Sequence, residues 1–438
     1  MKAAVIGAGL AGVEAAWQLQ KRGVAVELYE MKPQKRSPAH RADGFAELVC
    51  SNSLKAERVN SAAGLLKAEM AAFSSVCVEA AYRTRVPAGG ALAVDRERFS
   101  AYITEKIENC AGITVIHKEV TALPADADAV IVAAGPLASD ALAETIRKLT
   151  GEAGLSFYDA AAPIVTAESI DFSEAFTQSR YDRGGADDYI NCPMNKAQYE
   201  AFYEAITTAE RAETHSFDER RDVYEGCMPI EALASRGRDT MRYGPLKPVG
   251  LVDPKTGHRP WANLQLRKEN NAGTMYNLVG FQTNLKFGEQ KRVFSMIPAL
   301  KNAQFVRYGV MHRNTFLDSP RLLSADFSLK SDPHIFFAGQ ITGVEGYMES
   351  ASSGILAGIN AARRISGKET LVLPETTMMG ALSRYISDES VQDFQPMGAN
   401  FGVLPPVGVR IRDKAARYQV LADRALSALR AEKEKMGL

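Results

Sequence analysis

The first 30 residues constrain this chain more than any other segment. Residues 3–6 are apolar and lead directly into the turn "GAGLAG", after which apolar side chains recur at helical spacing. Gly23 ends this helix, and residues 24–30 alternate in the manner of a second strand. The order strand, tight turn, helix and strand predicts a βαβ unit at the start of an α/β fold.

The glycines of this turn have the spacing of a dinucleotide-binding fingerprint. Gly7 permits the tight turn, Gly9 lets a pyrophosphate approach the backbone, and Gly12 allows close packing of the helix, whose N-terminus carries partial positive charge. Glu30 closes the second strand and is placed to accept hydrogen bonds from an adenosine ribose. The alternative is a glycine-rich turn without a ligand. The predicted contact residues here are Gly7, Ala8, Gly9, Leu10, Ala11, Gly12 and Glu30.

The C-terminal third contains a second segment of the same kind. Residues 334–365 predict a strand, a loop punctuated by glycines and a helix with small side chains. They resemble the second FAD segment of flavoproteins of the glutathione-reductase class, although Gln340 replaces the usual acidic residue. Residues 127–136 resemble the strand that passes the adenine end. FAD is therefore favoured over NAD, and the further contact residues expected are Gly135, Gly339, Gln340 and Gly343.

Segments at both ends of the chain are thus expected to serve one cofactor. This predicts an α/β protein with a glutathione-reductase-like Rossmann FAD-binding domain that is discontinuous, over residues 1–160 and 325–438. An inserted α+β domain is expected over residues 161–324, where the composition becomes more polar and aromatic. Residues 410–436 have apolar side chains at helical spacing and predict a C-terminal helix.

Composition excludes several classes of protein. The 52 basic and 52 acidic residues cancel, so no global field indicates a nucleic acid or a membrane. The five cysteines are odd in number and include no CxxC pair, which argues against a disulfide framework, a zinc ribbon and a dithiol redox centre, and we expect no metal site. Because the chain also has no second GxGxxG and no long apolar run, we expect a cytoplasmic protein without membrane contact, whose nicotinamide donor, if any, docks without its own Rossmann unit.

Two of the cysteines precede predicted helix starts. Ser51, Asn52 and Ser53 are competent N-caps for a helix from residue 54, which places Cys50 just before it, and Cys227 comes two residues before Pro229. A helix N-terminus favours the reactive thiolate. The alternative for any single cysteine is an inert, buried, apolar side chain.

Five motifs together carry a specific resemblance: "GAGLAGVEAA", "AELVCSNSLK", "VYEGCMPIE", "LKPVGL" and "FFAGQITGVEGYMESASSG". The chain closely resembles the folate- and FAD-dependent tRNA uracil-5-methyltransferase family, known as TrmFO, most weakly over residues 370–438. The resemblance implies conversion of one T-loop uridine of tRNA to ribothymidine. The carbon comes from 5,10-methylenetetrahydrofolate and the reducing equivalents from FADH2, which NADPH or NADH regenerates. It implies tRNA, through its T-arm, and folate as partners, without an obligate protein partner.

The resemblance also assigns roles to individual residues. Cys227 is the candidate nucleophile for carbon 6 of uracil, and Cys50 is the second thiol, placed to remove the carbon 5 proton or to assist otherwise. Tyr347, expected in the loop before the last helix of the FAD segment, would lie against the flavin, or else is an aromatic packing residue. Basic side chains expected to contact phosphate or the pterin glutamate, unless merely solvated, are Arg236, Arg238, Arg242, Lys247 and Lys286.

Three alternatives stay open. The GidA-related family modifies the wobble uridine with similar chemistry, but its chains are longer and end in a helical domain. A flavin-dependent oxidoreductase acting on a small molecule would leave both cysteines incidental. An FAD-containing RNA chaperone would bind tRNA without forming a product.

Overall fold

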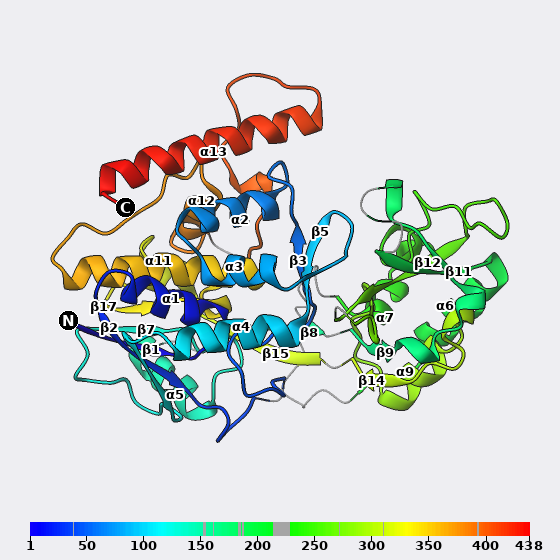
Figure 1. Ribbon diagram of the computed structural model, residues 1–438, viewed down its shortest axis with the longest axis horizontal. Coiled ribbons are helices and arrows are strands. Elements are labelled where there is room, and N and C mark those ends of the chain that lie inside the picture. The colour runs from blue at the N-terminus through cyan, green and yellow to red at the C-terminus, as the bar shows by residue number, and fades with distance from the viewer. Residues whose placement is uncertain are drawn as a thin grey trace.

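The structure is a computed structural model. It describes residues 1–37, 39–151, 155–160, 162–182, 185, 188–212, 228–270, 272–309, 311–391 and 394–438. Figure 1 shows two bodies joined by several crossings of the chain, with both termini in the larger one. The larger body contains the N-terminal βαβ unit and the C-terminal third, and the smaller one contains most of the middle of the chain.

A six-stranded sheet organises the larger body. Its order is β16-β17-β7-β1-β2-β6, and all neighbours are parallel except the edge pair β16 and β17. Read from β6 to β17, the parallel strands have the doubly wound order 3-2-1-4-5 in which dinucleotides bind. The predicted α/β fold and its first βαβ unit are confirmed. The strands are β1 (Lys2–Ile6), β2 (Ala25–Glu30), β6 (Ile113–His117), β7 (Ala129–Val132), β16 (Ser328–Leu329) and β17 (Asp332–Phe337).

Helices cover this sheet in layers. Helices α1 and α11 lie side by side next to the sheet, and α2, α12 and the long C-terminal α13 are stacked beyond them (Figure 1). The predicted C-terminal helix is therefore confirmed, and it buries one face, which includes Leu421 and Leu429. The helices of this body are α1 (Leu10–Gln20), α2 (Ala62–Ala72), α3 (Val76–Arg83), α4 (Arg96–Glu108), α5 (Asp140–Thr150), α10 (Ser319–Leu322), α11 (Tyr347–Ile365), α12 (Met378–Tyr385) and α13 (Lys414–Met436).

The segment after Cys50 is a strand, so the helix predicted from residue 54 is wrong. Strand β3 (Ser53–Ala56) pairs antiparallel with β5 (Ala91–Val94), which also pairs with β4 (Arg85–Val86). Leu54 is buried, whereas Lys55 is exposed at a positive φ of 63° that an α-helix does not allow. Pairing with a distant strand has overridden the local helix propensity.

The smaller body is built on an antiparallel sheet with its own apolar core. The strand order is β10-β11-β12-β13-β9-β14, and α6 and α7 pack with α9 and α8 around the core that contains Phe202, Phe281 and Phe294. The elements are β9 (Ile164–Thr166), β10 (Phe176–Thr177), β11 (Tyr189–Met194), β12 (Ala262–Lys268), β13 (Met275–Leu278), β14 (Phe305–Arg307), α6 (Lys196–Thr208), α7 (Ile230–Ser235), α8 (Thr240–Tyr243) and α9 (Phe287–Phe294).

A two-stranded ribbon connects the bodies. Strand β8 (Leu155–Ala160) pairs antiparallel with β15 (Met311–Phe316), so the chain enters and leaves the smaller body side by side. The ribbon includes strands from both sides of the boundary predicted at residue 161. Boundaries at 161 and 324 therefore stay our proposal, and we call residues 161–324 the insertion domain, although its last helix, α10, packs with the core of the larger body.

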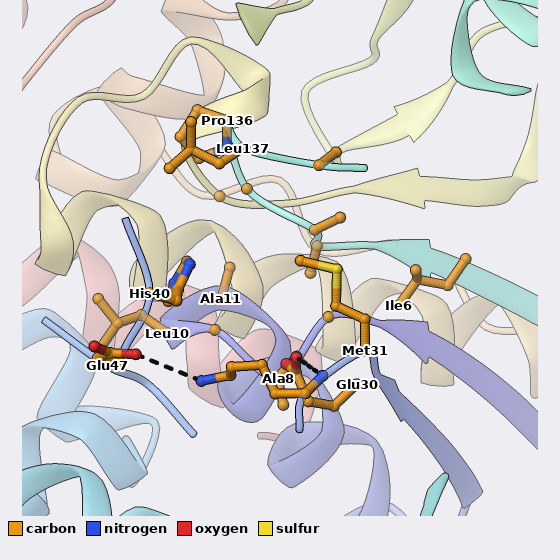
Figure 2. Close-up of a pocket in the computed structure, with 18 of the residues that line it drawn as sticks. Ile6, Ala8, Leu10, Ala11, Glu30, Met31, His40, Glu47, Pro136 and Leu137 are labelled. Carbon is orange, nitrogen blue, oxygen red and sulfur yellow. Dashed lines mark hydrogen bonds and ion pairs between the residues drawn. The ribbon is translucent and has the colours of Figure 1, made fainter. Parts of the chain in front are cut away.

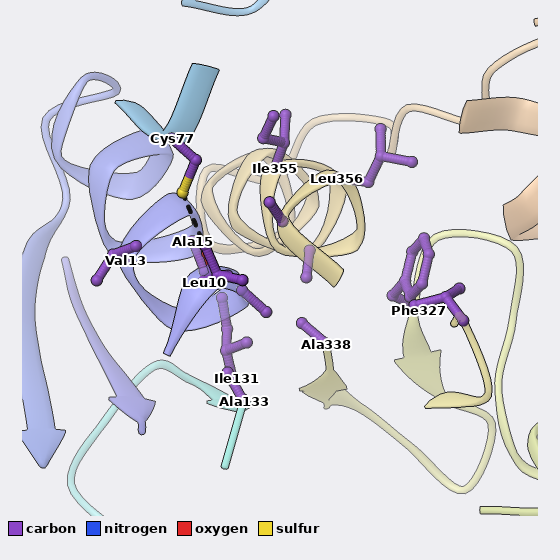
Figure 3. Packing of buried hydrophobic residues seen from close by; sticks show 14 of the residues in the cluster. Leu10, Val13, Ala15, Cys77, Ile131, Ala133, Phe327, Ala338, Ile355 and Leu356 are labelled. Atoms are coloured by element: carbon purple, nitrogen blue, oxygen red, sulfur yellow. Dashed lines mark hydrogen bonds between the residues drawn. The ribbon is translucent and has the colours of Figure 1, made fainter. Parts of the chain in front are cut away.

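Helices α1 and α11 approach each other closely because glycines stand at their contact. A Cβ built at Gly354 would lie 2.0 Å from the carbonyl oxygen of Ala11, and one at Gly358 would lie 2.6 Å from that of Ala15. Figure 3 shows α1, with Leu10 and Ala15, beside α11, which carries Ile355 and Leu356. The small residues noted in the sequence thus join the first and last thirds of the chain.

Two buried glutamates cap helices of this body. Glu14 accepts hydrogen bonds from Ser75 Oγ and from the backbone N–H of Cys77, in the first turn of α3. Glu69 accepts from the N–H groups of Met378 and Met379, which begin α12, at 2.7 and 2.8 Å. Burial raises the pKa of each carboxyl to about 7 although these bonds oppose the shift.

Among the described residues, no helix is long and apolar enough to cross a membrane. No group of three or more His, Cys, Asp or Glu side chains among them is arranged to hold a metal ion.

We predict that Gly354→Ala lowers the free energy of unfolding by about 1–3 kcal/mol, because the added methyl group collides with backbone across the α1–α11 contact. Urea denaturation followed by circular dichroism measures this change. Gly288→Ala in α9 is the matched control: no atom of the described residues lies within 4 Å of its Cβ, and it should stabilise by up to ~1 kcal/mol. Equal effects of the two substitutions would contradict the packing explanation.

We also predict a pH effect for Glu69. Its folded pKa of about 7 lies above the ordinary 4.5, so its contribution to stability is complete below about pH 4.5 and is lost as the pH rises through about 7. Glu69→Gln removes this titration. Between pH 5 and pH 8 the variant should therefore lose roughly 2.5 kcal/mol less stability than the parent protein, as urea titrations at each pH measure. Parallel stability curves for the two proteins would show that Glu69 does not titrate in this range.

Candidate active site

A large cavity lies at the carboxyl ends of the parallel strands. Its walls include Gly7 after β1, Met31 after β2, Ala133 after β7 and Gly339 after β17. Its empty volume, including space open to solvent, is about 1340 Å³. Figure 2 shows Ala8, Leu10, Glu30 and Pro136 around it. This edge includes the switch point between β1 and β7, where doubly wound sheets bind their ligands.

The glycine turn forms one wall of the cavity. Gly7 has a positive φ of 99° and donates its N–H to the carbonyl of Tyr29. A Cβ at Gly12 would lie 1.8 Å from the carbonyl oxygen of Gly7, so Gly12 packs behind the turn and does not line the cavity. At Gly9, no atom of the described residues is within 4 Å of such a Cβ.

Gly9 is also the N-cap of α1, and no side chain of the described residues caps this helix start. The N–H groups of its first turn therefore face the cavity with the partial positive charge of the helix. A phosphate group satisfies such a turn, and Gly9 leaves the room for it.

The Glu30 carboxylate stabilises this wall of the cavity through hydrogen bonds to backbone N–H groups. One carboxylate oxygen accepts from the N–H of Ala8 at 3.0 Å and the other from the N–H of Lys32 at 2.9 Å. The side chain is buried, and Figure 2 shows it beneath the turn. A carboxylate has about four acceptor positions, so lone pairs are left for a ribose hydroxyl at the cavity.

The other predicted cofactor residues are placed in two ways. Ala8, Leu10, Ala11, Gly135, Gly339 and Gln340 line the cavity with Gly7, Gly9 and Glu30. Gly343 is not among the lining residues. It follows a short 3-10 turn, and a Cβ built on Gly343 would collide with the ring of Phe394. The open glycine, the uncapped helix and the buried acid at one switch point fit the adenine dinucleotide part of FAD.

Cys50 and Tyr347 meet at the end of this cavity. Tyr347 is the first residue of α11 and not a loop residue as expected. Its hydroxyl oxygen accepts hydrogen bonds from the backbone N–H of Cys50 at 2.7 Å and of Ser51 at 3.1 Å. Burial and the neighbouring Cys50 raise the pKa of this phenol, so it stays protonated. The two residues are 297 positions apart in the chain, and both line the cavity.

Further residues around Cys50 escaped the sequence analysis. Arg96 donates to the carbonyls of Leu48 and Cys50, and Arg267 donates to the side chain of Asn52. They belong to no recognisable motif. The one available signal was an arginine within the apolar strand sequence "ANLQLRK", where a buried charge is uncommon.

The predicted basic contact residues do not line this cavity. They lie in the insertion domain, and most of those described have acidic neighbours: Arg238 pairs with Glu204 at 2.7 Å and Arg242 with Asp239 at 2.6 Å. The guanidinium of Arg242 also lies 3.9 Å from the ring centroid of Trp261. The remaining predicted residues are Arg236, which is exposed, Lys247, which is half-buried, and Lys286, which pairs with Glu210.

Cys227 lies outside the described residues, so its predicted role stays a prediction. The helix expected after it is present as α7, and Pro229 is its N-cap. The N–H of Ile230 donates to the carbonyl of Gln282 at 2.7 Å, which ties the start of α7 to the segment after β13.

Comparison with known proteins identifies relatives along the whole chain. The family model described as "Glucose inhibited division protein A" matches residues 2–369. A protein of Acetivibrio thermocellus named "Methylenetetrahydrofolate--tRNA-(uracil-5-)-methyltransferase TrmFO" is 58% identical over 426 residues, covering 97% of each chain. The protein of the same name from Listeria monocytogenes serotype 4b is 56% identical over 432 residues, covering 99% of each.

Solved structures show the same fold. Two crystal forms of GidA from Aquifex aeolicus match 98% of this chain with TM-scores of 0.71 and 0.72. Sequence identity is 18% and 17%, and the matches cover 73% and 76% of those chains.

We predict that Tyr347→Phe frees the segment around Cys50. The variant leaves two amide donors without their acceptor, which costs about 1–3 kcal/mol locally. Hydrogen exchange followed by mass spectrometry should show faster exchange at Cys50 and Ser51. Tyr29→Phe is the control, since Tyr29 also lines the cavity but donates its hydroxyl to the Glu27 side chain at 2.8 Å. Unchanged protection at Cys50 in the Tyr347 variant would contradict the importance of this contact.

Proposed function

Because the chain belongs to the glucose inhibited division protein A family and, within it, to the TrmFO methyltransferases, we propose that it methylates carbon 5 of a uridine in tRNA. The carbon donor is methylenetetrahydrofolate and the reductant is FADH2. The observation that carries this function is 56–58% identity to TrmFO proteins over nearly the full length of both chains. The target is the T-loop uridine, which becomes ribothymidine.

FAD is the cofactor of the main cavity. The residues that hold it are Gly9 and the first turn of α1 at the pyrophosphate, and Glu30 at the ribose. When bound, FAD supplies the reducing equivalents for the transferred carbon. NADPH or NADH regenerates its reduced form, docking without a domain of its own.

The uracil chemistry requires a nucleophile and a base. Carbon 5 of uracil becomes nucleophilic only after a thiolate has added to carbon 6, which forms a carbon–sulfur bond and an enolate. Carbon 5 then bonds to the methylene carbon and loses its proton to a base. The carbon–nitrogen bond to tetrahydrofolate breaks with its electron pair going to the folate nitrogen, which leaves an exocyclic methylene group on carbon 5. A hydride, which bound FADH2 would supply, converts this group to methyl, and expulsion of the thiolate from carbon 6 restores the ring. We assign the nucleophile to Cys227 and the proton transfer to Cys50.

The position of Cys50 supports its assignment. Its residue lines the cavity beside Tyr347, whose protonated hydroxyl holds the Cys50 backbone. The support for Cys50 comes from its place at the cavity and from these contacts. It does not come from a helix N-terminus, because the segment after Cys50 is strand β3. Tyr347 is assigned the place against the flavin because it starts α11 at the cavity wall.

Contact with tRNA is assigned to the basic side chains of the insertion domain. Arg236, Arg238, Arg242, Lys247 and Lys286 supply the positive charge, and Arg242 with Trp261 offers a stacked guanidinium and aromatic face of the kind that binds RNA bases. We assign the protein to the cytoplasm, where its tRNA and folate substrates are found, with no obligate protein partner. Cys77, Cys110 and Cys192 are free thiols, as a reducing compartment allows.

Wobble-uridine modification is the closest alternative and has less support. The GidA structures match in fold, but this chain covers only 73–76% of their length, whereas it covers 97–99% of the TrmFO relatives. A small-molecule oxidoreductase or a non-catalytic RNA chaperone does not account for the 56–58% identity to TrmFO proteins over nearly the full length of both chains.

The test is product formation in vitro. Purified flavin-loaded protein is incubated with unmodified tRNA, methylenetetrahydrofolate and NADPH, and the nucleosides are analysed for 5-methyluridine. We expect product from the parent protein, and at least a ~100-fold lower rate from Cys227→Ala and Cys50→Ala. FAD absorbance should persist in both variants.

Cys110→Ala is the control, because Cys110 follows α4 and does not line the cavity; it should keep full activity. Absence of 5-methyluridine from the flavin-loaded parent protein would refute the proposed function. Full activity of the Cys50 and Cys227 variants would refute their roles.

A further inference from the structure

The loop of residues 48–52, which carries Cys50, is fixed by arginines from distant parts of the chain. None of its five residues is in a helix or strand. Arg96 donates from Nη1 to the carbonyl of Leu48 at 2.6 Å and from Nη2 to that of Cys50 at 3.2 Å. Arg307 donates from Nη2 to the carbonyl of Val49. Three successive carbonyls of the loop therefore accept bonds from guanidinium groups.

The end of the loop is held in the same way. Arg267 donates to the hydroxyl oxygen of Ser51 and to Oδ1 of Asn52, both at 2.8 Å. The buried amide of Asn52 donates in turn to the carbonyl of Val94 on β5 at 3.0 Å and to that of Lys268 on β12 at 2.8 Å. The Asn52 side chain thus bridges two sheets: the small β3-β5-β4 sheet of the larger body, which we call the FAD-binding body, and the sheet of the insertion domain.

Arg96 also connects the two bodies, through an ion pair with Glu269. It is the first residue of α4 in the FAD-binding body, and its Nε and Nη2 donate to the two carboxylate oxygens of Glu269 at 2.6 and 3.2 Å. Glu269 directly follows β12 in the insertion domain. The side chains are 14% and 3% exposed, so this ion pair is shielded from solvent and salt.

Only an arginine can make this set of contacts. Its planar group offers five N–H donors in a rigid fork, so two edges serve different partners at once. Here the edge formed by Nε and Nη2 faces Glu269, and the edge formed by Nη1 and Nη2 faces the carbonyls of Leu48 and Cys50. Because Glu269 sets the plane of the fork, the position of the loop depends on the position of the insertion domain.

We propose that Arg96 is a positioning residue for Cys50, oriented by Glu269, so that the thiol is held at the cavity only while the insertion domain is docked against the FAD-binding body. The claim of positioning rests on the contacts above. Its consequence for catalysis rests on the proposed function. Arg96 itself has no assigned contact with substrate, and it acts through the backbone of the loop.

The first test measures the loop directly in the flavin-loaded protein. Each thiol is alkylated with iodoacetamide, and the rates are read from tryptic peptides by mass spectrometry, where Cys50 falls in residues 42–55, apart from the other cysteines. Arg96→Lys and Glu269→Gln should each change the labelling rate of Cys50 several-fold. Cys77 and Cys192, which are fully buried, should stay protected in both variants.

These two buried thiols separate positioning from general loosening. Faster labelling of Cys77 and Cys192 in step with Cys50 would show that the variants merely destabilise the protein, and it would overturn the proposal. So would an unchanged Cys50 rate. Arg85→Lys is the control, because Arg85 is exposed on strand β4 of the same small sheet and pairs with Glu57 at 3.2 Å. Its labelling pattern should match that of the parent protein.

The second test is a double-mutant cycle on tRNA methylation. Misplacing a reacting group by about 1 Å costs up to ~100-fold in rate, so each single variant should lower kcat by about 10–100-fold with little change in KM for tRNA. The double variant Arg96→Lys with Glu269→Gln should be no slower than the slower single one, because both substitutions remove the same fork.

Additive losses, or losses confined to KM, would overturn the proposal. The two tests also separate this proposal from the proposed function. Selective labelling changes in a protein that makes no 5-methyluridine would support the positioning and refute the methyltransferase assignment. Normal methylation by both variants would support the methyltransferase assignment and refute the positioning role of Arg96.

Discussion

The contact between α1 and α11 is the constraint on which the rest of this structure depends. Its closeness is possible because Gly354 and Gly358 face the backbone of Ala11 and Ala15. The contact places the starts of both helices at the same edge of the parallel sheet, although they are more than 300 residues apart in the chain. With Gly9 and Gly346 as N-caps, neither start is capped by a side chain of the described residues, so donors from both ends of the chain face one cavity.

The same closeness explains why the reactive loop depends on distant contacts. The first turn of α11 brings the Tyr347 hydroxyl against the backbone of Cys50 and Ser51, and the insertion domain supplies Arg267 and Glu269. A segment without ladder or helix hydrogen bonds must satisfy its polar groups elsewhere. The hydrogen-bond partners of this loop come from both bodies, so the loop that carries the thiol also lies at the contact between the two bodies.

The predictable parts of this fold were those encoded by neighbouring residues. The turn from Gly7 to Gly12 and the strand that ends at Glu30 follow from local spacing, and the structure contains both. The segment from residue 54 shows the limit of such reasoning. Its helix-favouring residues form a strand because β5 offers a ladder, and no local pattern reveals that partner. Arg96 and Glu269 were missed for the same reason, being 173 positions apart.

This limit has a physical meaning for function. A cofactor turn is recognisable because the ligand contacts consecutive backbone groups, which fixes the spacing of its glycines. The environment of Cys50 is assembled from Arg96, Arg267, Arg307 and Tyr347, and any arrangement that offers donors and an acceptor at the same points would serve. The loop sequence therefore carries the thiol, while the tertiary contacts decide where the thiol lies. An enzyme that brings a nucleotide of a folded RNA to a flavin gains from this division, because docking of the insertion domain and alignment of the thiol then occur together.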